Sequence, residues 1–261
     1  MLISAGHDVT GTTRSESKAP LIAASGAKPV VIDVYDRDRL RQVLAEARPD
    51  VVIHQLTDLA TFDFAGNTRV RVEGTRNLVD AALEAGTRRI IAQSISWICA
   101  PGDGLSTEND PLDLDSTGAR LGAVQGVLAL ETTVAEMPEW AVLRYGSLYG
   151  PGTWAERDSL RATSAKEGKI IANDAVTSFL HVEDSARAAV AALQWPSGIY
   201  NIVDDDPASA RDWVPAFAAY VGAPPPPVAS GHQPWERGAS NAKAKSVGWQ
   251  PEYPTWRQVW K

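Results

Sequence analysis

Hydroxyl-bearing residues stand at the ends of two apolar runs, where they could bind or protonate a ligand. Ser94 and Ser96 lie at the end of the run RRIIAQSIS, and Tyr145 and Tyr149 follow the run WAVLR. Open α/β sheets bind their ligands beyond the carboxyl ends of the strands, so we predict that these four residues are catalytic. A tyrosine without a neighbouring lysine is a weak base but a good hydrogen-bond donor.

The histidines and the acidic runs do not form a recognisable metal site. The four histidines are scattered, without the spacing of metal ligands. We interpret His54 and His181 as structural, because a histidine without a carboxylate partner is usually just hydrogen-bonded within the fold. The acidic run DGLSTENDPLDLD lacks the glycine and the terminal glutamate of a calcium loop at their required spacings. We therefore predict no metal.

The elements that must position these hydroxyl groups alternate regularly along the chain. Apolar runs of the type buried in parallel sheets alternate with helical stretches as far as Gly150, which predicts an α/β fold. The expected strands cover 7–14, 28–36, 49–57, 88–96 and 140–150, and the expected helices cover 37–47, 68–86 and 119–137.

The pattern changes beyond Gly150. We expect short strands at 168–173 and 198–204, a helix at 208–222, and a stiff polyproline connector in APPPPVAS. We therefore predict a core over residues 1–150 and a smaller C-terminal lobe over 151–261 that is interleaved with it. Most of the nine tryptophans lie in this second part, where we interpret them as packing residues.

Composition limits the partners and the compartment. With 261 residues, a net charge of -7 and no basic run, the chain is a poor match for nucleic acid or an anionic membrane, because phosphate binding needs concentrated positive charge. We predict a small-molecule substrate instead. The single Cys99 excludes an internal disulfide framework, and no signal peptide or membrane-spanning run is visible. We predict a cytoplasmic protein.

Several stretches together resemble the extended and atypical short-chain dehydrogenase/reductase superfamily, the NAD-dependent epimerase/dehydratase family. The resemblance covers nearly the whole chain and implies a Rossmann-like, doubly wound, mostly parallel sheet with a smaller C-terminal substrate lobe. It rests on VEGTRNLVDAALEAGTRRIIAQS, VLRYGSLYGPGT, TSFLHVEDSARAAVAAL, GIYNIVDDDPAS and SNAKAKSVGWQPEYPTW.

The resemblance implies that the family's first strand and its glycine-rich turn would precede LISAGHDV. No Gly-x-x-Gly-x-x-Gly segment occurs in residues 1–261, and we interpret the glycines at 118, 122 and 126 as close packing within a helix. Three arrangements stay open for the strand at 7–14. It pairs directly with the strand at 49–57, it keeps partly unpaired edges, or it belongs to a longer natural chain, which is the arrangement that we favour.

The resemblance also implies a dinucleotide site. Arg14 occupies the position of a basic residue for the adenosine 2'-phosphate, which favours NADP over NAD, and Asp33 occupies the position beside the adenine. Alternatively, Arg14 is a surface arginine and Asp33 caps the helix at 37–47. Without a phosphate loop in the natural chain, no cofactor is expected. The remaining predicted cofactor residues are Gln55, Leu56, Thr57 and Ser147.

The family's Tyr-x-x-x-Lys pair has no counterpart in this sequence. Anchored on Glu131, the tyrosine position falls at Ala123 and the lysine position at Val127, and none of the six tyrosines has a lysine four residues further on. In the family this pair moves the proton, because the ammonium group lowers the tyrosine pKa. The ordinary mechanism is therefore absent or rebuilt.

Three functions remain open on these observations. The first is an NADP-dependent epimerase, dehydratase or reductase that acts on a nucleotide sugar or another small hydroxy or keto metabolite. The second is a cofactor-free binding or regulatory module, and the third is a cofactor-independent isomerase or cyclase in the same cleft. The resemblance further implies a homodimer through the helices VEGTRNLVDAALEA and GAVQGVLALETTVA.

Overall fold

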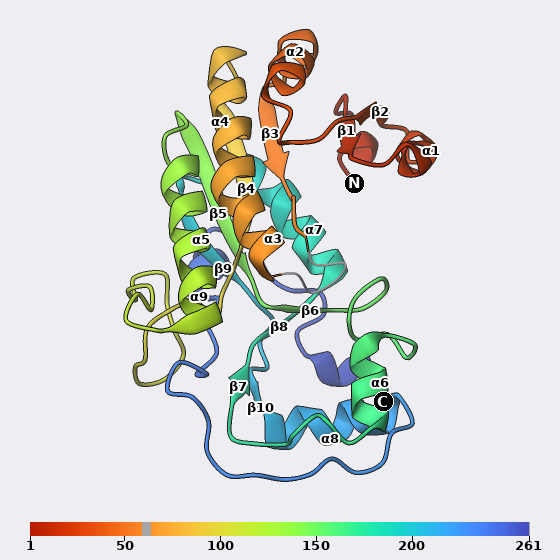
Figure 1. Ribbon diagram of the computed structural model, residues 1–261, viewed down its shortest axis with the longest axis vertical. Coiled ribbons are helices and arrows are strands. Elements are labelled where there is room, and N and C mark those ends of the chain that lie inside the picture. Colours follow the sequence, from red (N-terminus) through yellow and green to blue (C-terminus); the bar gives the residue numbers. More distant parts are fainter. Residues whose placement is uncertain (59–63, 261) are drawn as a thin grey trace. The chain divides into compact units, whose positions relative to one another are not determined.

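The computed structural model describes residues 1–58 and 64–260, and they form two compact units (Figure 1). The first unit comprises Met1–Ala92, Gln125–Val142 and Ala192–Gly198. The second comprises Gln93–Val124, Leu143–Ala191 and the residues from Ile199 onward. In the part of the chain that is described, no helix combines the length and the apolarity needed to span a membrane.

The first unit alternates short strands and helices, as the sequence predicts for its α/β class. The helical turn η1 (Ile3–Ala5) ends at Gly6, whose φ of 87° is left-handed and suits glycine. The elements that follow are β1 (Thr10–Thr13), η2 (Glu16–Lys18), α1 (Ala19–Ala24), β2 (Lys28–Val31), α2 (Arg37–Ala47), β3 (Val51–His54), α3 (Phe64–Arg69), η3 (Val70–Gly74) and α4 (Thr75–Glu84).

The strands of the first unit belong to two sheets. Strands β1 and β2 pair in parallel, with Thr10 opposite Lys28, and form a two-stranded sheet of their own among the described strands. Strand β3 pairs in parallel with β4 (Arg89–Ile95), with Val51 opposite Arg89. Direct pairing of the first strand with β3, which was one of the three expected arrangements, is therefore not observed among the described pairings.

The four-stranded sheet has the order β3-β4-β5-β9 and is the mostly parallel sheet of a Rossmann-like α/β fold. Strands β4, β5 (Glu139–Tyr145) and β9 (Gly198–Ile202) each begin in the first unit and end in the second. The carboxyl ends of these strands therefore belong to the second unit.

Helix α2 shows how local sequence fixes an element. Its N-cap is Asp36, whose carboxylate accepts a hydrogen bond from the Arg39 N–H at 3.0 Å. The interpretation of Asp33 as the cap is therefore wrong, because its carboxylate accepts from the Tyr35 N–H instead. The buried face of α2, which includes Leu40 and Leu44, packs beside α4 (Figure 1).

The expected long helix at 68–86 is interrupted by the π-helical turn η3. An extra residue in a helical turn rotates the following side chains relative to those before it. Leu78 and Ala82 are buried, as expected for a core-facing stripe, whereas Val72 and Leu83 are exposed. Helix α4 ends at Glu84, and Gly86 follows with a φ of 78°, a left-handed value that suits a glycine just after a helix.

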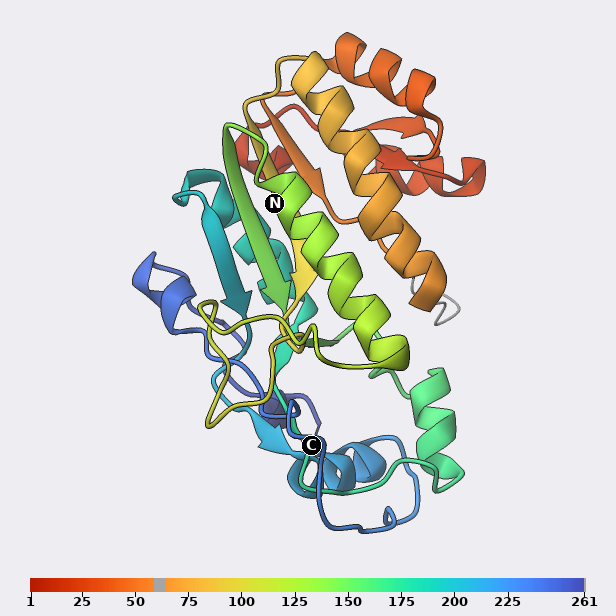
Figure 2. The same cartoon turned by 60° about the vertical axis from the view of Figure 1, so that its left-hand side comes forward.

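Residues 125–134 of α5 (Gly118–Val134) run beside α4 (Figure 2). A Cβ added to Gly126 would lie 3.2 Å from the Thr68 Cγ2 atom, which confirms close packing at this glycine. A Cβ added to Gly118 or to Gly122 would meet nothing within 4 Å among the described residues. The described residues show no close packing at these two glycines.

The second unit contains short strands and a group of helices near the C-terminus. The expected strand at 168–173 does not form, and Ala172 makes an isolated bridge to Val228 instead. Its partner segment follows a run of prolines, which have no N–H to donate to a ladder. The elements are β6 (Ser147–Tyr149), α6 (Leu160–Lys166), β7 (Val176–Thr177), β8 (Phe179–His181), α7 (Val182–Ala191), β10 (Ala208–Ser209), α8 (Ala210–Tyr220), α9 (Ala242–Ser246) and η5 (Trp256–Gln258).

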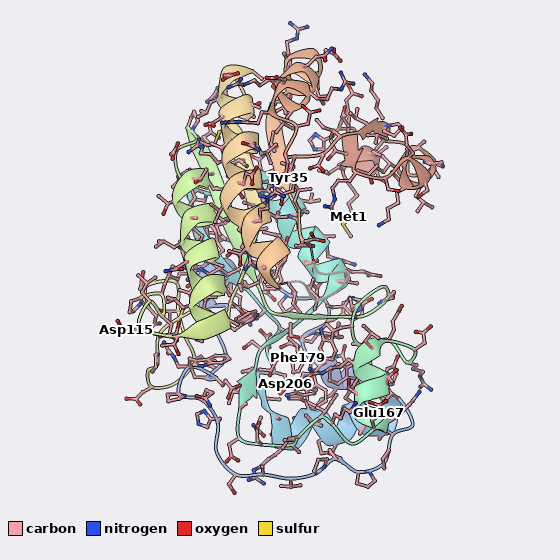
Figure 3. The ribbon with its side chains drawn as sticks, viewed as in Figure 1. Met1, Tyr35, Asp115, Glu167, Phe179 and Asp206 are labelled. Atoms are coloured by element: carbon pink, nitrogen blue, oxygen red, sulfur yellow. The ribbon has the colours of Figure 1, made fainter. Side chains whose placement is uncertain are left out.

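Aromatic side chains form the core of the second unit. The ring of Phe179, labelled in Figure 3, lies 5.6 Å from the ring centroid of Trp213 and 5.4 Å from that of Trp260. Trp256 is fully buried in the same cluster. These edge-on and tilted contacts confirm the prediction that most C-terminal tryptophans pack the core.

Candidate functional site

A cavity of about 160 Å³ lies within the second unit and contains two of the predicted site residues. Ser96 and Ser147 both line it, and Ser96 is almost completely buried. The remaining lining residues are Trp97, Trp235, Glu236, Gly238 and residues 175–178. The cavity therefore combines two hydroxyl groups with two indole rings.

The sheet brings the two serines together from separate strand ends. Ser96 follows β4, and its N–H donates to the Tyr145 carbonyl oxygen at the end of β5, at 3.0 Å. Ser147 is the first residue of β6, and its N–H donates to the Ser178 carbonyl oxygen at 2.9 Å. Both serines thus lie at carboxyl ends of sheet strands, where ligands bind in open α/β folds.

Gly146 allows this corner between β5 and β6 to form. A Cβ at this position would lie 2.7 Å from the Ser178 carbonyl oxygen and 3.0 Å from the Phe179 carbonyl oxygen. The first distance is shorter than real Cβ contacts and the second is unusually tight, and both obstructing atoms are backbone. The absence of a Cβ is therefore what lets Ser147 reach the cavity.

The other predicted catalytic residues lie outside the cavity lining. Ser94 is fully buried. The Tyr145 hydroxyl donates to the Ser185 carbonyl oxygen at 3.2 Å, and the Tyr149 hydroxyl donates to the Tyr253 carbonyl oxygen at 3.4 Å. Burial raises the pKa of Tyr149 far above its ordinary value, which makes that phenol a poor proton donor to a base at neutral pH.

The tryptophan walls were not predicted from the sequence. Trp97 directly follows Ser96, and this position was the only available signal for it. Trp235 lies far along the chain in a segment without a helical or strand pattern. Its place in the cavity depends on tertiary structure, which the spacing of residues does not reveal.

The predicted cofactor residues of the first unit follow three of its strands. Arg14 comes directly after β1, Asp33 lies just beyond β2, and Gln55 follows β3. The Arg14 guanidinium lies 3.4 Å from Asp58, and its side chain is 54% exposed. An exposed ion pair contributes about 1 kcal/mol or less, so Arg14 can exchange Asp58 for another anion.

These residues fit the adenosine half of a dinucleotide. Gln55 and Thr57 are exposed, Leu56 is half-buried, and Asp33 is exposed. An exposed guanidinium can bind a phosphate, and an exposed carboxylate can accept hydrogen bonds from a nucleoside. Residues 1–58 offer no glycine-rich turn for the diphosphate, so these residues supply no site for that group.

The two conspicuous histidines have structural partners. His54 Nε2 lies 2.9 Å from the Thr75 hydroxyl oxygen, and complete burial lowers the His54 pKa to about 4. The His181 ring stacks on the Tyr253 ring with centroids 3.6 Å apart, and burial lowers its pKa as well. Both observations agree with the structural interpretation of these residues.

Comparison with known proteins identifies relatives of the whole chain. Residues 1–203 match the model of the NAD dependent epimerase/dehydratase family. A 3-diazoavenalumate denitrifying reductase from a Streptomyces species is 40% identical over 279 aligned positions, which cover 97% of this chain and 90% of that protein. A dTDP-L-rhamnose 4-epimerase from Burkholderia thailandensis is 24% identical, covering 92% of this chain and 81% of that protein.

Solved structures support the same fold. The enzyme WbmG of Bordetella bronchiseptica, in complex with NAD and UDP, superposes with a TM-score of 0.77 at 20% identity, over 99% of this chain and 88% of that chain. The UDP-Glc/GlcNAc 4-epimerase of Campylobacter jejuni gives a TM-score of 0.78 at 18% identity, over 100% and 91% of the two chains. At these identities the likeness establishes the fold alone.

Proposed function

Because the chain belongs to the NAD dependent epimerase/dehydratase family, we propose that it is a nicotinamide-dependent reductase that removes the diazo group of a small organic acid. The single observation that carries this proposal is the 40% identity to a diazo-compound reductase over 97% of this chain and 90% of that protein. The wider assignment, an enzyme of the epimerase/dehydratase or oxidoreductase kind, follows from the family itself.

The proposed reaction balances without a proton relay. When bound, a reduced nicotinamide would supply a hydride; the carbon–nitrogen bond of R–N₂⁺ would break as the new C–H bond forms, giving R–H, dinitrogen and the oxidised cofactor. Dinitrogen leaves as a neutral molecule, so no hydroxyl proton has to be removed. An epimerase, by contrast, must take a proton from a substrate hydroxyl as hydride leaves. The buried Ala123 and Val127, which align with the family's tyrosine and lysine, suit the first reaction and not the second.

The cavity supports a small, flat substrate. Its volume of about 160 Å³ is below the roughly 300–1,000 Å³ of sites for drug-sized ligands, and a nucleotide sugar is larger still. The rings of Trp97 and Trp235 offer flat apolar surface, and the hydroxyls of Ser96 and Ser147 can donate to substrate oxygen. In this proposal the two serines orient the substrate and the two indoles exclude water from it.

We further propose NADP as the preferred cofactor. Arg14 would bind the 2'-phosphate, Asp33 would lie beside the adenine, and Gln55, Leu56 and Thr57 would line the ribose and nicotinamide. Ser147 is the remaining residue predicted to bind the cofactor. The family comparison supports NAD chemistry, and the exposed Arg14 supports the preference for the phosphorylated form.

A homodimer and a cytoplasmic location also belong to this proposal. The exposed apolar side chains of Val72, Leu83 and Leu128, on η3, α4 and α5, support self-association of the first unit. Light scattering on Leu128→Glu tests this point. We expect the variant to be monomeric at concentrations at which the wild type is dimeric.

The function is tested with 4-carboxybenzenediazonium and NADPH, by following absorbance of the reduced nicotinamide. We expect steady oxidation with the diazonium compound and no epimerisation of UDP-glucose in the presence of NAD⁺. Ser96→Ala should lower kcat/KM about tenfold, the value of one hydrogen bond. Ser164→Ala, on the exposed face of α6, is the matched control. Epimerisation of the sugar without reduction of the diazonium compound would exclude the proposal.

A further inference from the structure

Arg120 uses its guanidinium to hold the loop that follows β4. Its Nε donates to the Asp113 carboxylate at 2.6 Å, its Nη1 donates to the Trp97 carbonyl oxygen at 2.9 Å, and its Nη2 donates to the Cys99 carbonyl oxygen at 3.0 Å. The side chains of Arg120 and Asp113 are only 12% and 7% exposed. The guanidinium is thus a fixed part of the structure rather than a mobile surface charge.

The same guanidinium also contacts a second residue that lines the cavity. Its central carbon lies 3.8 Å from the centroid of the Trp235 ring, which is a cation–π distance. Arg120 therefore binds the backbone of Trp97 and the ring of Trp235 at once. These two tryptophans come from distant parts of the sequence and both line the cavity, whereas Arg120 is not among the lining residues.

We propose that Arg120 is a positioning residue that sets the separation and orientation of Trp97 and Trp235, and so determines the affinity of the cavity for flat aromatic acids. The inference rests on the proposed function in taking this cavity as the substrate site. Arg120 acts through the two tryptophans, because its N–H groups are engaged by Asp113 and by the two carbonyl oxygens.

Arginine is the side chain that can make these contacts together. A planar guanidinium donates in its plane to several acceptors while its face stacks on an aromatic ring, whereas a lysine ammonium is a point charge without a face. Arg120→Lys therefore keeps the charge beside Asp113 and loses the simultaneous hold on both tryptophans. The substitution separates a purely electrostatic role from a geometric one.

The experiment compares Arg120→Lys and Arg120→Ala with a matched control. Arg211→Lys serves as the control, because Arg211 also donates to a carboxylate, that of Asp174, and to a carbonyl oxygen, that of Ala229, and contacts neither Trp97 nor Trp235 in any described interaction. The measurements are KM and kcat for 4-carboxybenzenediazonium with NADPH, and the Kd of benzoate by calorimetry. Near-UV circular dichroism reports the packing of the aromatic residues.

We expect Arg120→Lys to raise both KM and the benzoate Kd about tenfold, with less than about a threefold change in kcat. Millimolar guanidinium should restore benzoate affinity to Arg120→Ala, and it should have no such effect on the wild type or on Arg211→Lys. If Arg120→Ala does not fold, the comparison of the benzoate Kd of Arg120→Lys with that of Arg211→Lys still tests the positioning role.

A wild-type benzoate Kd in Arg120→Lys would overturn the inference, and so would a loss that guanidinium does not restore in folded Arg120→Ala. Benzoate binding does not depend on turnover, so the two proposals can fail separately. A protein that binds benzoate through Arg120 but never reduces the diazonium compound would retain the positioning role and lose the proposed function.

Discussion

Asp204 is a buried carboxyl group whose ionisation opposes folding. Its side chain is 2% exposed, and one carboxylate oxygen accepts a hydrogen bond from the Asp206 N–H at 3.2 Å. The other oxygen has no hydrogen-bond partner in the described structure. Burial raises the pKa of Asp204 to about 8, and the neighbouring charges of Asp206 and Asp205 raise it further.

This pKa predicts a stability that falls as pH rises. Between the ordinary aspartate pKa, about 4, and the folded value of about 8, the folded state holds a proton that the unfolded state has lost. One such group lowers the free energy of unfolding by up to about 1.4 kcal/mol per pH unit. Asp204→Asn should remove this slope and stabilise the protein at pH 8, as urea unfolding at pH 5 and pH 8 would measure. Parallel pH profiles of variant and wild type would contradict the prediction.

Arg14 is the residue that would determine the proposed preference for NADP over NAD. A guanidinium–phosphate contact is a charge-assisted hydrogen bond and contributes about 1.5–3 kcal/mol. Arg14→Ala should therefore weaken NADPH binding about tenfold to a hundredfold and leave NADH binding nearly unchanged, which thermal shift titrations with both cofactors would measure. Arg39→Ala, an exposed arginine of α2, is the control. Equal loss of both cofactors would argue against a 2'-phosphate contact.

Strand ends indicated candidate residues only in part. Of the four residues chosen in this way, Ser96 lines the cavity, whereas Ser94, Tyr145 and Tyr149 do not. Ser147, which also lines it, was predicted as a cofactor residue from the family resemblance. Trp235 could not be placed in this way, because its segment has no regular pattern and its ring packs on Arg120, a residue more than a hundred positions away in the sequence. The burial of Tyr149 was also hidden, because an aromatic core forms only once distant segments meet.

At the scale of elements, the corner between β5 and β6 depends on one glycine. Gly146→Ala would force a Cβ against two carbonyl oxygens of the β8 segment, and neither backbone atom can move cheaply. We expect a loss of about 1–3 kcal/mol in the free energy of unfolding, together with a loss of activity, because Ser147 begins β6 directly after this corner.

Gly122→Ala is the matched control for this element. It lies inside α5, where an added Cβ meets nothing within 4 Å among the described residues. Alanine should stabilise the helix there by about 0.5–1 kcal/mol. Urea unfolding of both variants measures these changes in the free energy of unfolding. A Gly146→Ala variant as stable as the wild type would contradict the claim that the corner between β5 and β6 needs a glycine.

Helices and strands could be predicted where the hydrophobic pattern and the residues that end an element indicate the same range. The runs at 49–57 and 88–96 form β3 and β4, and the stretch at 37–47 forms α2. The run at 168–173 has strand composition but forms no strand, because its partner segment is rich in proline. The π-helical turn η3 was hidden as well, since it changes the helical phase without a sequence signal.

At the scale of the whole molecule, the alternation of runs and the family resemblance predicted the α/β class and the mostly parallel sheet. The three arrangements left open for the strand at 7–14 did not name a separate sheet of β1 and β2. Sequence patterns indicate where strands occur more reliably than which strands pair. The fold accommodates both epimerases and reductases. The substrate therefore has to be inferred from the residues that line the cavity and not from the fold.

The most direct measurement counts dinitrogen released against NADPH oxidised, with 4-carboxybenzenediazonium as substrate and an enzyme-free sample to correct for spontaneous decay. The proposed reaction predicts one molecule of dinitrogen for each molecule of NADPH consumed. NADPH oxidation without dinitrogen release, or enzyme-dependent dinitrogen release without NADPH oxidation, would contradict reductive removal of the diazo group.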